Sequence, residues 1–318
     1  MRETPVLLLA YNRADKVRDL IDRLRPQAPR TVLVAVDGPK SGQPADAARV
    51  EAVHRELERI DWTDRVDTLL RPENLGLRRA VAGAVTWAID AYGQAIVIEE
   101  DVLPGRDWIP YATRMLERHR QNDRIAHISG YSVVPPAHLR REDGSRLTRY
   151  PESIAWATWD RAWTAYDPDM TWARQASVAE LAELTGSRLA GLRWRQLFAD
   201  AAAERVQTWA YRWIASMWSR GWFTLSPNRS LVAYAGYDEG THTATRRASW
   251  DEQPLWEGGL DEVVDGVTTE LDPGAEAYQR RVVFGGTVQG LARGAASSAV
   301  LGLRRRVRLA RARRGSGR

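Results

Sequence analysis

Three consecutive carboxylates, Glu99, Glu100 and Asp101, follow an apolar run at residues 94–98. Like charges a few ångströms apart raise one another's pKa, so the cluster is unfavourable unless something neutralises it. A divalent cation does so, and such sites often combine one or two carboxylates with substrate phosphates. The triplet therefore predicts either a metal site against a diphosphate or a solvated loop with a chance cluster of acids. The apolar segments on both sides favour the metal site.

Polar residues also follow three other strand-like runs, at residues 5–10, 31–36 and 66–70. In a parallel sheet the carboxyl ends of the strands share one edge, and ligands bind beyond that edge. We therefore expect the residues after these runs to lie near the acidic triplet and to form one nucleotide site with it. They are Tyr11, Asn12, Arg13, Asp37, Gly38 and Arg71.

Arg78 and Arg79 stand at the start of a predicted helix over residues 77–92. Backbone N–H groups and the helix dipole attract anions at a helix N-terminus, and guanidinium groups bind phosphates well. One of the two arginines is therefore predicted to contact a pyrophosphate. The alternative is ordinary surface charge.

Strand-like and helix-like patterns alternate through the first 130 residues and must position these side chains. This alternation indicates βαβ units and a parallel sheet, so we expect an α/β fold of Rossmann-like type. Strands are predicted at residues 5–10, 31–36, 66–70, 94–98 and 124–129, and helices at 14–25, 45–60, 77–92 and 108–120.

After about residue 130 the regular alternation is lost and tryptophans become frequent. We expect an irregular second half that packs against the sheet. It should contain helices near residues 177–184, 191–204 and 209–220, and a pair of strands within 223–234. The acidic, Gly- and Pro-rich stretch at 251–275 is predicted to be a loop.

Several segments, taken in order, resemble the motifs of GT-A-type nucleotide-diphospho-sugar transferases. More narrowly, they resemble bacterial family-2-like glycosyltransferases related to eukaryotic N-acetylglucosaminyltransferase I. The resemblance covers about residues 5–245. It rests on Leu9-Ala10-Tyr11-Asn12-Arg13, Val36-Asp37-Gly38, Asn74-Leu75-Gly76-Leu77, Ile98-Glu99-Glu100-Asp101, Trp156-Ala157-Thr158-Trp159, Trp209-Ala210-Tyr211-Arg212-Trp213 and Thr241-His242-Thr243.

The resemblance implies a GT-A fold with a mostly parallel central sheet and an irregular acceptor-side half. It also implies a nucleotide-diphospho-sugar donor, with a UDP-sugar favoured, and Mn²⁺ or Mg²⁺ as cofactor. Asp101 would bind the metal, and His242 would contact the metal or the diphosphate. Asp37 would accept a hydrogen bond from the base. The other donor-site residues would be Tyr11, Asn12, Arg13, Asn74, Arg78, Arg79, Glu99 and Glu100.

Inverting transfer requires a base that deprotonates the acceptor hydroxyl, and a carboxylate serves well. Related proteins often carry an acid at the position of Ala210, so the base of this chain must lie elsewhere. The predicted candidates are Asp238, Glu239 and Glu204, with Asp200 and Asp160 as further alternatives. Large aromatic side chains are usually core residues. By their place in the motifs, Trp156, Trp159 and Trp209 are predicted to face the acceptor.

Residue composition and charge exclude some kinds of chemistry and indicate where the protein is located. The chain has no cysteine, so disulfides and thiolate chemistry are excluded. It shows neither a signal peptide nor a transmembrane run, so a cytoplasmic location is expected. The segment 304–318 holds eight arginines and no acid, and subtracting these eight charges from the net +5 leaves −3 for the rest. This distribution argues against a nucleic-acid groove.

We expect a single catalytic domain over residues 1–300, with a nucleotide-binding half at 1–130 and an acceptor-side half at 131–250. A basic tail at 301–318 would follow. The tail could be solvated, or it could contact the anionic inner face of a membrane near lipid-linked acceptors.

The predicted function is hexosyl or N-acetylhexosaminyl transfer to a glycan or lipid-linked acceptor in surface polysaccharide or glycan biosynthesis. One alternative is a sugar-phosphate nucleotidyltransferase. Those enzymes usually have a Gly-rich loop after the first strand, and residues 10–14 contain no glycine. The other alternative is a non-catalytic protein that binds sugar nucleotides.

Overall fold

The computed structural model describes residues 4–236 and 253–315. The chain forms two compact units, each built from two separate stretches of sequence. The first unit comprises residues 1–165 and 221–276, and the second comprises 166–220 and 277–318. The expected halves at 1–130 and 131–250 do not coincide with these units, because later segments return to the sheet of the first unit.

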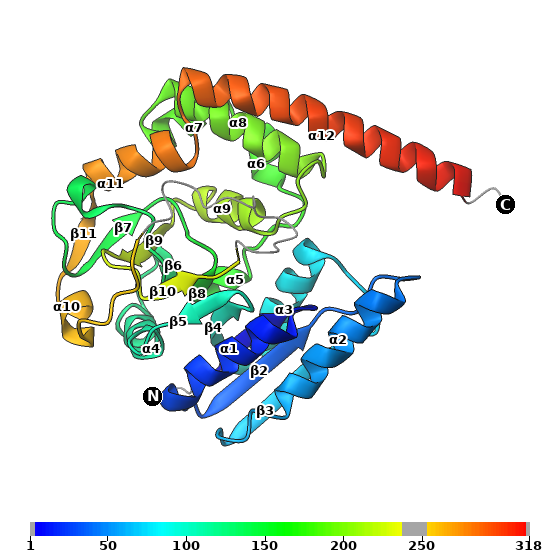
Figure 1. The fold of residues 1–318 in the computed structure, drawn as a ribbon. Helices are drawn as coiled ribbons and strands as arrows, with labels where there is room; N and C mark the ends of the chain where they lie inside the picture. Colours follow the sequence, from blue (N-terminus) through cyan, green and yellow to red (C-terminus); the bar gives the residue numbers. More distant parts are fainter. Residues whose placement is uncertain (1–3, 237–252, 316–318) are drawn as a thin grey trace. The chain divides into compact units, whose positions relative to one another are not determined.

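A nine-stranded sheet forms the centre of the first unit (Figure 1). Its order is β11-β7-β9-β6-β8-β4-β1-β2-β3, and five of the eight neighbouring pairs are parallel. The strands are β1 Val6–Ala10, β2 Thr31–Val36, β3 Arg65–Leu70, β4 Gln94–Glu99, β6 Ile125–Ser129, β7 Ser145–Thr148, β8 Ala155–Trp159, β9 Phe223–Pro227 and β11 Val267–Leu271.

The β3-β2-β1-β4 part of the sheet is parallel throughout and confirms the predicted Rossmann-like half. β1, β2 and β4 are largely apolar, and β2 is buried along its whole length, as expected for a strand covered on both faces, whereas the edge strand β3 has no buried residue. Ala10 pairs with Val36, Val36 pairs with Leu70, and Leu9 pairs with Glu99. The residues that follow these four strands therefore start from one edge of the sheet.

The helices of this half end close to the predicted positions. In α3, Ala80, Val81, Ala84 and Val85 repeat at helical spacing and are buried. Gly93 ends the helix in the left-handed conformation, which glycine adopts without strain. The helices of the first unit are α1 Ala14–Leu24, η1 Arg25–Gln27, α2 Pro44–Leu57, α3 Leu77–Tyr92, α4 Trp108–Arg118, η2 Pro136–His138, α5 Asp160–Trp163, α10 Leu260–Val264 and, across the unit boundary, α11 Pro273–Tyr278.

The later part of the first unit is more regular than the sequence predicted. Strand β8 lies antiparallel between β4 and β6, and β7 and β11 extend the same sheet. The prediction of a loop over residues 251–275 is therefore wrong, because α10, β11 and the start of α11 lie there. The predicted strand pair within 223–234 is also wrong as a pair. β9 joins the large sheet, whereas β10 Val232–Tyr234 pairs with β5 Val102–Pro104.

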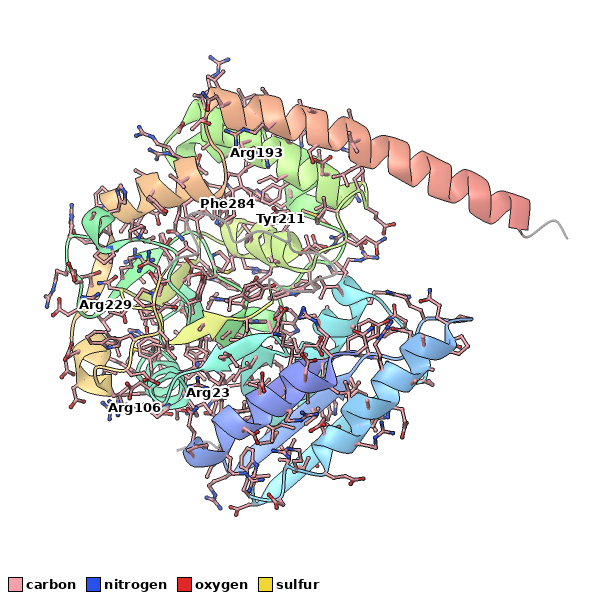
Figure 2. The ribbon with its side chains drawn as sticks, in the orientation of Figure 1. Arg23, Arg106, Arg193, Tyr211, Arg229 and Phe284 are labelled. Carbon is pink, nitrogen blue, oxygen red and sulfur yellow. The ribbon has the colours of Figure 1, made fainter. Side chains whose placement is uncertain are left out.

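The second unit is helical and packs around aromatic side chains (Figure 2). Trp194 lies 4.6 Å from Trp218, 4.8 Å from Phe284 and 6.0 Å from Tyr211, measured between ring centroids. These helices confirm the three that were predicted near residues 177–184, 191–204 and 209–220. They are α6 Thr171–Gln175, α7 Val178–Thr185, α8 Arg188–Ala202, α9 Ala210–Trp218, η3 Gln279–Val283 and α12 Val288–Gly315.

Helix α12 packs on α8 through small residues. A Cβ at Gly294 would lie 2.1 Å from Nη1 of Arg193, and the Ser298 hydroxyl bonds to Asp200. The backbone is helical through Gly315, so most of the predicted tail continues a helix instead of forming a separate segment. Among the described residues, no helix combines the length and the apolar content needed to cross a membrane.

Candidate functional site

A cavity of about 240 Å³ lies at the carboxyl edge of β1, β2 and β4 in the first unit. Its wall brings together most of the predicted donor-site residues, including Arg71, with Lys40, a cation that was not predicted to lie there. The lining residues are Leu9, Ala10, Tyr11, Arg13, Ala35, Asp37, Lys40, Arg71, Asn74, Gly76, Leu77, Ala80, Val81, Glu99, Glu100, Asp101 and Tyr234.

Asp37 holds a turn on one side of the cavity. Its Oδ1 accepts hydrogen bonds from the backbone N–H groups of Gly38 (3.1 Å) and Leu75 (2.9 Å). Its Oδ2 accepts from Asn74 Nδ2 (3.0 Å) and from the N–H of Gly76 (3.1 Å). A carboxylate offers about four acceptor positions. The four hydrogen bonds from the protein therefore already occupy those of Asp37. The structure places Asp37 at the cavity but gives it a positioning role in place of the predicted contact with a base.

Gly38 is required by the same turn. A Cβ at this position would lie 2.4 Å from the backbone nitrogen of Glu73. That distance is far below van der Waals contact, and backbone atoms cannot move away as a side-chain end can. The close approach of the two loops after β2 and β3 therefore depends on glycine here.

Asp46, in the first turn of α2, does not line the cavity itself but holds residues that do. It is buried and accepts hydrogen bonds from the Tyr11 hydroxyl (2.5 Å), from Asn12 Nδ2 (2.6 Å) and from the N–H of Lys40 (2.8 Å). Burial alone would raise the pKa of Asp46, but these donors, together with Arg49, lower it to about 2. Burial and the Asp46 carboxylate raise the pKa of Tyr11. The Tyr11 ring is thus fixed against the cavity.

Asn12 differs from its prediction. It is not among the lining residues, and Asp46 engages its side-chain amide. The structure therefore corrects its predicted place in the base and ribose pocket, since its role here is to hold the turn after β1. Sequence reasoning missed Asp46, because an acid in the first turn of a helix is commonplace and nothing in the sequence marks it as buried.

The acidic triplet forms the turn between β4 and β5 and lines the cavity as predicted. Glu100 accepts a hydrogen bond from the N–H of Tyr11 at 2.7 Å. Burial raises the pKa of Glu100 to about 7, although this hydrogen bond and Arg13 act in the opposite direction. Burial also raises the pKa of Asp101, and the Arg13 guanidinium opposes that rise.

The two oxygens of Asp101 have different surroundings. Oδ2 lies 3.0 Å from Nη1 of Arg13, and both side chains are largely buried. Oδ1 is buried and has no hydrogen-bond partner in the part of the chain that the structure describes. An unpaired buried carboxylate oxygen is costly, and a cation would remove that cost.

The surroundings of this oxygen show how a divalent metal could fit at the acidic turn. No group of three or more His, Cys, Asp or Glu side chains able to hold a metal occurs among residues 4–236 and 253–315. A site of one or two carboxylates completed by phosphate oxygens and water is typical for Mg²⁺. Asp101 Oδ1 fits such a site. Glu100 and Glu99 are the other carboxylates beside it, and His242 lies outside the described residues.

Two cations in the cavity wall can meet a diphosphate. Arg71 has no side-chain hydrogen bond or ion pair within the described residues, and burial lowers its pKa while Asp37 opposes this. Lys40 Nζ lies 5.5 Å from the centre of the Tyr11 ring. The predicted pair, Arg78 and Arg79, is not among the lining residues. The cations that do line the cavity are Arg13, Arg71 and Lys40, so the lining gives no support to the prediction for Arg78 and Arg79.

The tryptophans predicted to face an acceptor lie in the core. Trp156, Trp159 and Trp209 are each at most 2% exposed. Trp156 stacks on His127 with centroids 5.0 Å apart, and Trp159 Nε1 donates to the carbonyl of Leu116. These side chains cannot present a ring face to a sugar in this structure, so the prediction is corrected to core packing.

The predicted bases that the structure describes do not line the cavity. Asp238 and Glu239 lie outside the described residues, and so does His242, which was predicted to contact the metal or the diphosphate. Glu204 belongs to the second unit, follows α8 in the left-handed conformation and does not line the cavity. Asp200 pairs with Arg205 and binds Ser298, which is a structural role.

No protein-family model and no curated protein matches the chain, whereas a number of solved structures are similar to it. One of the solved structures that are similar is the crystal structure of mouse xyloside xylosyltransferase 1 in its apo form. The two chains are 10% identical with a TM-score of 0.37, over 67% of this chain and 81% of the mouse chain. A likeness this distant does not bear on activity.

Proposed function

We propose that this protein is a glycosyltransferase that uses a nucleotide-diphospho-sugar donor and a divalent metal. The observation that carries the proposal is the cavity at the carboxyl edge of the sheet, where the unpaired Oδ1 of Asp101 shares a wall with Arg71 and Lys40. One group there suits a metal ion, and the two others suit phosphate oxygens. The motifs that resemble GT-A transferases support the same reading, with a UDP-sugar as the favoured donor.

In the proposed reaction an acceptor hydroxyl oxygen forms a bond to the anomeric carbon, and the bond from that carbon to the diphosphate oxygen breaks. The hydroxyl proton passes to a carboxylate base, and the nucleoside diphosphate leaves. Inversion at the anomeric carbon, and a base among Asp238, Glu239 and Glu204, are part of the proposal. A metal ion bound at Asp101 would neutralise the negative charge that develops on the diphosphate.

The chain's own residues supply binding and orientation. Arg71 and Lys40, which line the same cavity as the acidic turn, would bind diphosphate oxygens. Tyr11, fixed by Asp46, offers a ring face to the nucleoside, and the Asp37 turn sets the shape of the pocket beside it. Preorganised charges of this kind lower a barrier because they need no rearrangement during the reaction.

A thermal-shift screen of UDP-, GDP- and dTDP-sugars with and without Mn²⁺ tests the proposal. A ligand at 100 times its Kd stabilises the folded state by about 2.7 kcal/mol, so the donor should raise Tm, and more so with Mn²⁺. Asp101→Asn should lose the Mn²⁺-dependent part of the rise. Asp64→Asn, in an exposed ion pair with Arg30, is the matched control.

The outcomes separate the alternatives. Binding followed by release of nucleoside diphosphate supports a transferase. Binding without any donor turnover across a set of glycan and lipid-linked acceptors identifies a non-catalytic binding protein. If no sugar nucleotide raises Tm under either condition, the proposal is wrong.

We also propose that the arginine-rich end of α12 contacts an anionic membrane surface and brings the enzyme near lipid-linked acceptors. The motivation is the density of arginine in residues 304–318 on a chain whose remainder is slightly acidic.

A further inference from the structure

The acidic turn is held in place by a strand that comes from a distant part of the sequence. β10 pairs with β5 antiparallel, and Tyr234 lies opposite Val102, the residue that follows Asp101. The N–H of Ala235 then donates to the Asp101 carbonyl oxygen at 2.8 Å. The end of β10 is therefore fixed directly beside the Asp101 side chain.

Tyr234 also bonds to that side chain. Its hydroxyl forms a hydrogen bond with the Asp101 carboxylate. Because Oδ1 has no partner among the described residues, the hydroxyl must bond to Oδ2, the oxygen that Arg13 also contacts. Two donors from different parts of the chain thus converge on one oxygen and leave the other without a donor.

Gly236 provides the space for this arrangement. A Cβ at this position would lie 2.5 Å from Asp101 Oδ2 and 2.3 Å from the Tyr234 hydroxyl oxygen. Both of these atoms are the ends of side chains. A larger residue would therefore push the carboxylate or the hydroxyl aside without requiring the backbone to move.

We infer that Arg13, Tyr234 and Gly236 are positioning residues that fix Asp101 through Oδ2, so that Oδ1 alone is presented to a metal ion. The inference rests on the proposed function for the assignment of Asp101 as a metal ligand. What it adds is how the chain orients the Asp101 carboxylate. Groups that orient a metal ligand commonly change metal affinity 10–100-fold when they are removed.

The decisive variants are Tyr234→Phe and Gly236→Ala. The first removes only the hydroxyl and keeps the ring in the cavity wall. The second adds a methyl group that displaces Asp101 Oδ2 or the Tyr234 hydroxyl. Neither changes the net charge, which avoids the uncertainty of removing Arg13, whose positive charge also repels a metal. Tyr92→Phe is the matched control, because its hydroxyl also donates to an aspartate, Asp67, at 3.2 Å on the outer strand β3.

Binding of Mn²⁺ alone to the full-length protein is measured by electron paramagnetic resonance of the free ion, and circular dichroism checks that each variant is folded. We expect Asp101→Asn to abolish binding, Tyr234→Phe and Gly236→Ala to raise the Kd on the order of 10-fold or more, and Tyr92→Phe to match the wild type. Wild-type affinity in both decisive variants would overturn the inference and leave the metal site standing.

Binding of Mn²⁺ that is unaffected by Asp101→Asn, or no binding at all, would also overturn the inference. Neither result would decide the proposed function, since sugar-nucleotide binding and turnover are measured separately.

Discussion

Asp37 illustrates, at the scale of single residues, that a side chain can lie in a binding site with its hydrogen-bonding capacity already used. The turn at residues 74–76 and the N–H of Gly38 take up both carboxylate oxygens. A base could bond to Asp37 only by displacing part of this turn. We therefore expect the selectivity for the base to come from other polar groups of the cavity.

Glu100 leads to a prediction about pH. Its pKa is about 7 in the folded protein and near 4.5 in the unfolded chain, because burial disfavours its charge. The folded state therefore binds more protons between these values. The contribution to stability is fully present below pH 4.5 and is lost as the pH rises through 7.

We expect Glu100→Gln to reduce the loss in the free energy of unfolding between pH 5 and 8 by on the order of 2 kcal/mol in metal-free buffer. Urea unfolding of the wild type and the variant at each pH measures this free energy. Burial also raises the pKa of Glu152 to about 7, so only the difference between the two proteins reports on Glu100. Parallel stability curves for both proteins would contradict the prediction.

The sequence predicted the location of Tyr11, Arg13, Asp37 and the acidic triplet because each follows a strongly apolar strand. It could not predict the roles of Asp46, Tyr234 and Gly236. These depend on contacts between segments that lie far apart in the chain, and local pattern carries no information about such contacts.

At the scale of elements, β1, β2 and β4 were predicted from nearly continuous apolar runs, whereas β8, which is also apolar and buried, was not predicted. β7 and β11 escaped prediction because their residues are largely polar. In β7, Ser145, Arg146 and Thr148 are buried and bonded inside the protein, so hydropathy does not separate the segment from a loop. Three helices of the second unit, α7, α8 and α9, were predicted from the helical spacing of their apolar residues, whereas α6 and α12 were not.

Strand β8 gives a prediction about stability. Trp156 is fully buried on it and stacks on His127, so Trp156→Ala should remove a large apolar contact and leave a cavity. We expect a loss of about 3–5 kcal/mol in the free energy of unfolding, measured by urea denaturation. Val66→Ala, on the exposed side of β3, should change it by less than about 0.5 kcal/mol. If Trp156→Ala instead left stability unchanged and impaired the use of an acceptor, the predicted acceptor role of Trp156 would be restored.

At the scale of the whole chain, charge is distributed unevenly. The last 15 residues carry eight arginines, whereas the rest has a net charge of −3. Each basic residue near an anionic bilayer contributes about 1 kcal/mol, and salt screens the attraction.

We expect full-length protein to co-sediment with phosphatidylserine vesicles, and protein lacking residues 304–318 to bind at least about 10-fold less, since 1.4 kcal/mol already gives that factor. Binding should fall as NaCl is raised, and phosphatidylcholine vesicles are the control. Equal sedimentation of the two proteins would rule out the membrane contact.

The reversed direction of β8 has a consequence for how this molecule could diversify. Because β8 runs against β4 and β6, the segment that enters it reaches the same rim as the segments that leave its neighbours, and the carbonyl of Ile154 accepts a hydrogen bond from the N–H of Glu99. The segment before β8 thus borders the acidic turn, and neither it nor the segment after β6 lines the cavity. Residues 130–134 and 150–152 are buried at this rim, so sequence change there is constrained by the core, and variation has to come from what extends beyond these segments.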